Sequence, residues 1–161
     1  MLFSSMTFVF VFLPILLLLY LVTKKELHNY ILLIASILFY AWGEPKYLAI
    51  MLITTIVNYF GAILIEKFRE IKKDKIILIS TIIINLSFLI YFKYFNFIIE
   101  NINNIFACNI DFIKIIMPIG ISFYTFQALS YVIDVYRGEC KAQHNIYKLA
   151  LFICLFPKLI A

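Results

Sequence analysis

The sequence predicts an all-α protein that crosses a membrane five or six times. Of its 161 residues, 65% are hydrophobic and 14% are charged, and the mean hydropathy is +1.01. Soluble domains usually carry about 25% charged residues. The apolar residues form six runs separated by short polar stretches: 6–22, 30–42, 47–65, 76–92, 115–133 and 146–161. In hydrocarbon every backbone polar group needs an internal partner, which favours helices here because the alternation typical of barrel strands is missing.

The first run, Met6–Val22, is predicted to be a retained membrane anchor. Its 17 residues would form a helix of about 26 Å, close to the roughly 30 Å thickness of the hydrocarbon core. It has no basic stretch before it and no small-x-small cleavage site after it, so it does not resemble a signal peptide.

The second run, Tyr30–Trp42, is short and spans only if Leu27–Asn29 join it. If it spans, loops 23–29, 66–75 and 134–148 share one side and carry ten Lys and Arg residues against three on the other; if not, the division is eight against five. The first division fits the positive-inside rule better, and both place 66–75 in the cytoplasm. The N-terminus is then predicted to lie outside.

The stretch "FYAWGEPKY" (39–47) joins the second and third runs. Gly43 and Pro45 end a helix, and the flanking aromatic residues suit a membrane interface. A tight interfacial hairpin is the simpler interpretation, and a direct functional role for Glu44 is the alternative.

The fifth run differs from the others because it carries polar residues at helical spacing: Gln127, Ser130, Tyr131, Asp134 and Arg137. They would form one stripe on a helix, with Asp134 and Arg137 placed to pair near the cytoplasmic interface. Pro118 and Gly120, which precede these polar residues, make the backbone there irregular near membrane depth. Two interpretations stay open: the stripe binds neighbouring helices and caps its own, or it lines a cavity for a polar substrate or donor.

The sequence predicts no catalytic residue and no metal site in this chain. His28 and His144 are expected in cytoplasmic loops, without a nucleophile and carboxylate nearby in the sequence. The three cysteines lack the spacing of metal or redox sites. The net charge of +5 lies in short loops between apolar runs, so it does not indicate a nucleic-acid partner.

Four strings carry a resemblance to a known family: "FSSMTFVFVFLP" (3–14), "LLIASILFYAWGEPKYL" (32–48), "MPIGISFYTFQALSYVIDVYRGE" (117–139) and "LFICLFPKLIA" (151–161). Together they resemble the N-terminal part of a bacterial membrane-bound O-acyltransferase, with the alginate O-acetyltransferase-like branch as the nearest match. The resemblance implies a multi-pass enzyme of the bacterial cytoplasmic membrane, and it would place the stripe on the wall of a buried reaction chamber.

The resemblance also implies substrates and partners. The acyl donor would be acetyl-CoA or another acyl thioester from the cytoplasm, with no cofactor bound by the chain. The acceptor would be an extracytoplasmic polysaccharide, reached with the help of an extracytoplasmic acyltransferase partner. The family's catalytic histidine lies later in a longer chain and has no counterpart here, so 1–161 is expected to be a single, truncated transmembrane domain that is inactive alone.

Two other function classes remain open from the sequence. A membrane transport protein also uses broken helices and polar stripes, but it would be expected to show a corresponding interruption in a second repeat. An accessory or structural membrane subunit would use the stripe to dock a partner.

Overall fold

The computed structural model describes residues 6–106 and 117–159, and all regular structure in these residues is helical. Residues 6–22 are helical, with a π-helical turn η1 (Phe8–Phe12) leading into α1 (Leu13–Val22). A 3-10 turn η2 (Lys25–Leu27) precedes α2. The remaining helices are α2 (His28–Gly43), α3 (Leu48–Phe68), α4 (Asp74–Phe106), α5 (Ile121–Arg137), α6 (Ile146–Cys154) and α7 (Phe156–Leu159).

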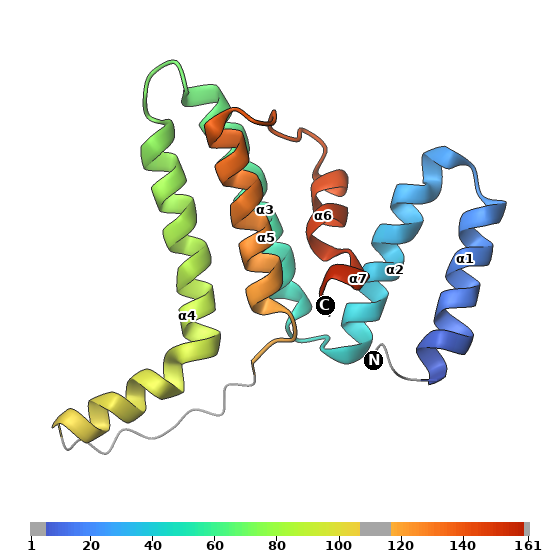
Figure 1. Cartoon of the computed structure of the whole chain (residues 1–161), viewed down its shortest axis with the longest axis horizontal. Helices are drawn as coiled ribbons and strands as arrows, with labels where there is room; N and C mark the ends of the chain where they lie inside the picture. The colour runs from blue at the N-terminus through green and yellow to red at the C-terminus, as the bar shows by residue number, and fades with distance from the viewer. Residues whose placement is uncertain (1–5, 107–116, 160–161) are drawn as a thin grey trace.

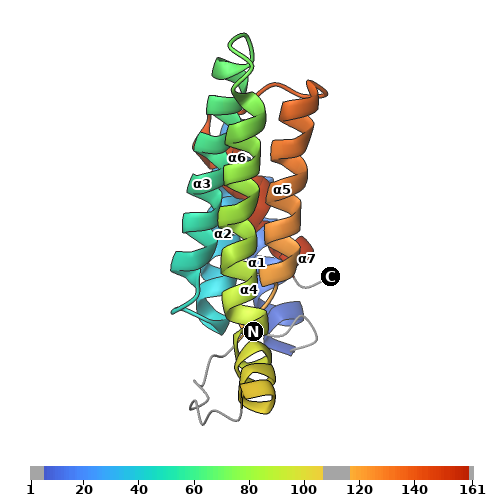
Figure 2. The same ribbon diagram turned by 90° about the vertical axis from the view of Figure 1, so that its left-hand side faces the viewer.

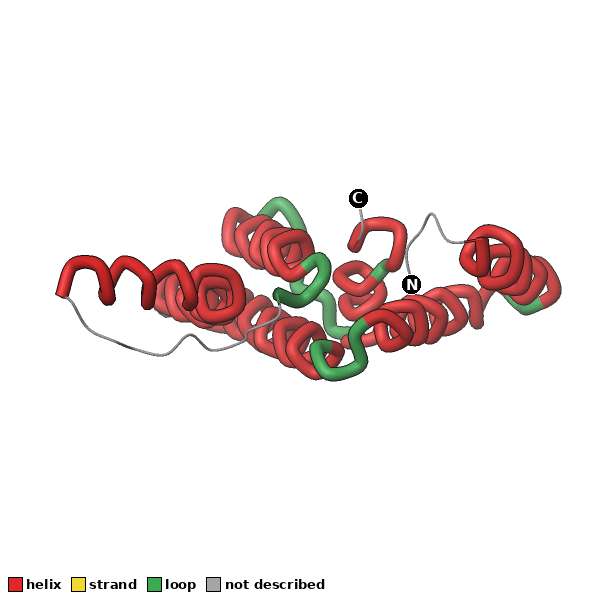
Figure 3. Tube along the Cα trace, turned by 90° about the horizontal axis from the view of Figure 1, so that it is seen from below, coloured by secondary structure: helices red, strands yellow, loops and turns green. Residues whose placement is uncertain are grey.

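The helices form a row with a partial second layer on one side. In Figure 1, α4 stands at one end of the row and α1 at the other, and α3 packs against both α4 and α5. The view along the helices shows α5 and the α6–α7 pair lying on the same side of the row (Figure 3). Helix α6 packs against α2 and α3, and α7 contacts α2 and α5.

The three basic loops lie at the same end of the bundle. The α1–α2 link, the α3–α4 loop and the start of the α5–α6 connection all lie at the top of Figure 1, whereas the α2–α3 turn and the start of α5 lie at the bottom. The helices thus place at one end the loops expected to share one side of the membrane.

Two of the described helices, α3 and α4, are long and apolar enough to cross a membrane, and Phe8–Val22 is a shorter apolar helix. Helix α4 runs well beyond the predicted run 76–92, and its last part turns away from the bundle (Figures 1 and 2). Of Leu27–Asn29, which the spanning alternative for the second run adds to it, His28 and Asn29 belong to α2, whereas Leu27 ends η2.

Two predicted runs are not continuous helices. The last run, 146–161, breaks between α6 and α7 at Leu155. The reason is Pro157, which has no N–H to donate and whose ring would clash with the carbonyl of Ile153. The fifth run becomes helical at Ile121, after the Pro118–Gly120 turn. Ile115 and Ala161, the outer limits of these runs, lie outside the described residues, as does Cys108.

A buried polar contact holds α3 and α4 together. The side-chain amides of Asn58 and Asn85 bond reciprocally, at 2.8 and 3.2 Å, and are 0% and 1% exposed. Each also donates to a carbonyl one turn earlier in its own helix. One turn along α3, a Cβ on Gly61 would lie 2.7 Å from Oγ1 of Thr81, so the close approach of the two helices requires glycine there.

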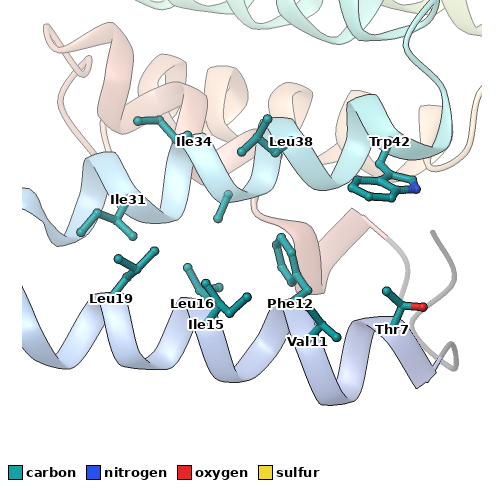
Figure 4. Close-up of a pocket in the computed structure, with 11 residues that line it drawn as sticks. Thr7, Val11, Phe12, Ile15, Leu16, Leu19, Ile31, Ile34, Leu38 and Trp42 are labelled. Atoms are coloured by element: carbon teal, nitrogen blue, oxygen red, sulfur yellow. The ribbon is translucent and has the colours of Figure 1, made fainter.

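The N-terminal helices pack through a cluster of phenylalanine rings. Phe8, Phe12, Phe39 and Phe156 have their ring centroids 5.4–5.9 Å apart and join η1, α2 and α7. Beside the cluster, α1 and α2 diverge to leave a groove of about 480 Å³ (Figure 4). Apart from Thr7 and the indole of Trp42, aliphatic and Phe side chains line it, so this groove offers no chemistry beyond contact with apolar chains.

The amide pair can be tested by a double-mutant cycle. We expect Asn58→Ala and Asn85→Ala each to lower the free energy of unfolding by about 1–3 kcal/mol, because each leaves a buried amide partly unpaired. The double variant should lose less than the sum of the two single losses. Unfolding in mixed micelles, followed by circular dichroism, measures this. Ser87→Ala, on an exposed hydroxyl bonded within α4, is the control, and additive losses for the Asn pair would contradict the coupling.

Candidate functional site

The turn before α5 is held by the end of α2. The carboxylate of Glu44 accepts a hydrogen bond from the backbone N–H of Ile119 at 2.8 Å, and the hydroxyl of Tyr40 donates to the carbonyl of the same residue at 3.2 Å. Both polar groups of one peptide-chain residue are thus bound by α2 and the turn that follows it. The strings "FYAWGEP" and "PIG", far apart in the sequence, form one structural unit.

The local sequence explains this geometry. Pro118 precedes the turn, and Gly120 takes a left-handed conformation with φ of 74°, which residues with a Cβ adopt at a cost. The N–H of Ile121 then bonds to the carbonyl of Pro118, and that of Tyr124 to Gly120, which starts α5. Glu44 and Tyr40 bind the exposed peptide of this turn because the helix leaves it without an intrahelical partner.

The α6–α7 break is also held by side chains of other helices. The fully buried Ser36 on α2 accepts a hydrogen bond from the N–H of Phe156 at 3.3 Å, while its own hydroxyl donates to Leu32 at 2.7 Å. On the other side, the side-chain amide of Gln127 on α5 donates to the carbonyl of Phe152. The broken helix is therefore fixed in place, as irregular backbone in an apolar setting requires.

Between the turn and the break lies a tightly packed core. Tyr124, Met51 and Cys154 are completely buried there, and the Thr55 hydroxyl lies 4.0 Å from the sulfur of Cys154. The hydroxyl of Thr125, on the α5 face that packs into the bundle, is buried and has no hydrogen-bond partner among the described residues. This core holds the turn and the break in fixed positions relative to each other.

The predicted polar stripe lies along α5, but its members have different surroundings. Gln127 reaches the α6–α7 break, and the Tyr131 hydroxyl accepts a hydrogen bond from the N–H of Gln143 at 2.8 Å. Ser130 is exposed, and Asp134 is half-buried. Arg137 lies 3.9 Å from Glu139, so the expected Asp134–Arg137 pair is replaced by a contact beyond the end of the helix. Among the five residues, Gln127 lines a described cavity; a role as chamber wall stays a prediction for all of them.

The C-terminal end of α5, which is predicted to face the cytoplasm, is capped by a residue from another loop. Gly138 adopts φ of 81°, and the N–H groups of Gly138 and Glu139 bond to Val135 and Asp134 in a Schellman arrangement. The guanidinium of Arg69, from the α3–α4 loop, donates to the carbonyls of Val135 and Tyr136. Arg69 thereby ties two basic loops together and stabilises the negative end of the helix dipole.

The two histidines differ from each other in setting. His28, expected in a loop, begins α2. Its ring centroid lies 3.9 Å from that of Tyr20, and its Nε2 lies 3.0 Å from the carbonyl oxygen of Thr23. His144 is an exposed loop residue, as expected, and its ring nitrogen lies 3.7 Å from the Glu66 carboxylate. Among the described residues, no group of His, Cys, Asp and Glu is arranged to hold a metal ion.

Cys140 lies exposed in the loop after α5. Partial burial of the thiol raises its pKa, and the carboxylates of Asp134, Glu139 and Glu66 raise it further because they disfavour a thiolate. The thiol is therefore accessible but less reactive at neutral pH than an ordinary cysteine.

Sequence reasoning missed two residues that build this site. Ser36 is a lone hydroxyl in the apolar string "LLIASILFY", and Tyr40 is one of several interfacial aromatics, so neither pattern shows which backbone group it binds.

Comparison with curated proteins gives matches over the whole chain. It is 40% identical to the probable alginate O-acetylase AlgI of Pseudomonas aeruginosa, 38% identical to that of Azotobacter vinelandii and 33% identical to the peptidoglycan O-acetyltransferase of Helicobacter pylori. The chain spans about a third of the length of these relatives (32%, 33% and 36%). No family model matches the chain, and no solved structure matches it significantly.

These matches confirm the resemblance to membrane-bound O-acyltransferases that the four strings predicted. Together with the two membrane-capable helices, they indicate a membrane location.

The hydrogen bonds of Glu44 and Tyr40 to Ile119 form a clamp on this residue. The clamp predicts that Glu44 protects the Ile119 amide from hydrogen exchange. Glu44→Ala should speed hydrogen exchange of the Ile119 amide by about ten- to a hundredfold, because a hydrogen bond to a charged group contributes roughly 1.5–3 kcal/mol. Glu44→Gln, which keeps an acceptor oxygen, should give an intermediate rate. Exchange in lipid nanodiscs read by mass spectrometry measures this, with the distant Glu26→Ala as control. An unchanged rate in Glu44→Ala would show that the contact does not hold the turn.

Proposed function

We propose that this chain is a segment of a multi-pass membrane O-acetyltransferase that acetylates a cell-envelope polysaccharide. The observation that carries the proposal is its similarity, over its whole length, to alginate and peptidoglycan O-acetylating proteins. The Ile119 clamp supports it, because it joins two of the strings on which the resemblance rests.

The arrangement of the helices supports a topology of five or six membrane passes. The helices from α1 to α5 run in alternating directions along the chain. The loops that carry ten Lys and Arg residues lie at the same end of the bundle (Figure 1). The positive-inside rule places that end in the cytoplasm and the N-terminus outside. On this orientation α6 enters from the cytoplasm, and it breaks after nine residues, about 14 Å along its axis and well short of a full span.

The same orientation suggests how the substrates approach. The basic cytoplasmic end would attract an anionic acyl thioester such as acetyl-CoA, which we propose as the donor. The acceptor polysaccharide, or an extracytoplasmic acyltransferase that passes the acetyl group on, would meet the opposite end near the Ile119 turn. The α6–α7 break lies between the two ends, where the stripe residue Gln127 would contribute to the wall of the reaction chamber. We propose that catalytic groups come from outside residues 1–161.

Gene deletion tests the proposed activity. Deleting the gene that encodes this chain should remove O-acetyl groups from an envelope polysaccharide, and its complete product should restore them. Base-released acetate, together with the acetyl signals in the NMR spectrum of the purified polymer, provides the measurement. Undiminished acetylation in the deletion strain would refute the activity, whereas detection of solute flux in its place would favour a transporter.

Cys140 tests the orientation. In a variant with Cys108 and Cys154 replaced by alanine, a membrane-impermeant maleimide should label Cys140 in inverted vesicles and not in intact cells. Because its pKa is raised, the thiolate forms at higher pH than usual, so the labelling rate should still be climbing where an ordinary thiol has levelled off. Asp134→Asn should shift that rise to lower pH. Labelling in intact cells would reverse the proposed topology.

A further inference from the structure

A polar pocket lies between the α1–α2 link with the start of α2 and the start of α6. It has a volume of about 290 Å³, and its lining consists of two lysines, two asparagines, two tyrosines and one glutamate. Helices α2 and α6 pack against each other. Two segments far apart in the sequence thus form one pocket, which we call the lysine pocket.

The positive charge of the lysine pocket comes from Lys25 and Lys148, one from each segment. Both side chains are exposed, and neither takes part in a salt bridge within residues 6–106 and 117–159. Glu26 is the one acidic residue of the described lining, so two cations against one carboxylate leave a net charge of +1. Two lysines that approach from different segments suit a phosphate group, whose several oxygens can each accept a charge-assisted hydrogen bond.

The asparagines add hydrogen-bond donors to this charge. The side-chain oxygen of Asn145 accepts bonds from the backbone N–H groups of Tyr147 and Lys148 at 3.0 and 3.3 Å, which caps α6. Because the oxygen is used in this way, the N–H groups of the amide are the part of Asn145 that remains for a ligand. The cap also fixes Asn145 before a ligand binds, and Asn29, in the first turn of α2, supplies a second amide.

The lysine pocket lies at the level expected for lipid headgroups. The α1–α2 link and the start of α6 lie toward the end of the bundle that carries the basic loops (Figure 1). Tyr30 and Tyr147, whose ring centroids are 5.8 Å apart, are 45% and 57% exposed. Exposed tyrosine rings are typical of the boundary between hydrocarbon and headgroups.

From the lysine pocket an apolar path runs along α2 toward the middle of the bundle. Ile34 and Leu38 follow Tyr30 at intervals of one turn, on the same side of the helix, and are 57% and 59% exposed. Both also line the apolar α1–α2 groove. A soluble phosphate compound would leave this path unused, whereas the acyl chain of a phospholipid would cover it.

We propose that the lysine pocket binds the phosphate of an anionic phospholipid, with Lys25 and Lys148 on the phosphate and an acyl chain along Tyr30, Ile34 and Leu38. Basic pockets between membrane helices on the cytoplasmic side are a recurring type of site for such headgroups. The inference goes beyond acetyl transfer, and it rests on the proposed orientation only for the choice of the cytoplasmic leaflet. A lipid bound here would hold the start of α6 to the start of α2.

Titration of the complete gene product with lipids in detergent micelles tests this, with bound lipids counted by native mass spectrometry. The probe is phosphatidylglycerol, and phosphatidylcholine with the same acyl chains is the matched neutral lipid. We expect phosphatidylglycerol to bind several-fold more tightly. Lys148→Gln and Lys25→Gln should each weaken its binding by about fivefold, since a lysine near an anionic lipid contributes on the order of this factor.

Two further variants make the test specific. Glu26→Gln should strengthen phosphatidylglycerol binding by a similar factor, because it removes the negative charge of the lining. A variant that merely folds poorly would not bind more tightly. Lys73→Gln, on an exposed lysine of the α3–α4 loop at the same end of the bundle, is the matched control and should leave the affinity unchanged.

Each other outcome overturns the site. Equal affinity for the two lipids, an unchanged affinity in Glu26→Gln, or a preference that survives both lysine variants would exclude binding of an anionic headgroup here. Displacement of phosphatidylglycerol by an excess of soluble glycerol phosphate would show that the pocket takes a free phosphate compound in place of a lipid. Because lipid binding is measured without acetyl transfer, its failure would leave the proposed activity standing, and loss of that activity would leave the lipid site standing.

Discussion

The structure depends on one constraint: in an apolar bundle, each backbone group that a helix leaves unpaired must find a partner on another helix. Such a group costs several kcal/mol in hydrocarbon when it is left alone. The turn before α5, the break after α6 and the end of α5 all interrupt helical bonding. Glu44, Ser36 and Arg69 each supply the missing partner at one of these points. The side chains that determine the fold are therefore the few polar ones in otherwise apolar segments.

The same constraint explains why polar side chains gather at the α6–α7 break. Helix α6 cannot continue through Pro157, so its last carbonyls and the next N–H groups need outside partners. Gln127 meets one of those needs and borders the cavity beside Lys158. An interruption that costs stability thus also places polar groups inside an otherwise apolar bundle, which a continuous helix would not do.

The sequence predicted the helical class, the positions of most helices and the grouping of the basic loops, because apolar runs and loop charges report these directly. It did not predict where irregular segments find partners, because hydrogen bonds such as those of Tyr40 and Glu44 with Ile119 join residues 79 and 75 positions apart. A stripe at helical spacing identified Gln127, but it also grouped Ser130 and Arg137 with it, whose surroundings differ. Spacing shows which residues share a helix face, and the neighbouring helices decide what each residue contacts.

The clamp on Ile119 also bears on the order in which the protein is made. Its two halves lie far apart in the sequence, so the ribosome releases the end of α2 long before the Pro118–Gly120 turn emerges. Until α5 is inserted, Glu44 and Tyr40 have no peptide at Ile119 to bind, and they remain at the interface exposed to water. The arrival of α5 completes the clamp. Assembly of this end of the bundle is thus a late step in biogenesis, coupled to the arrival of the segment that carries the polar stripe.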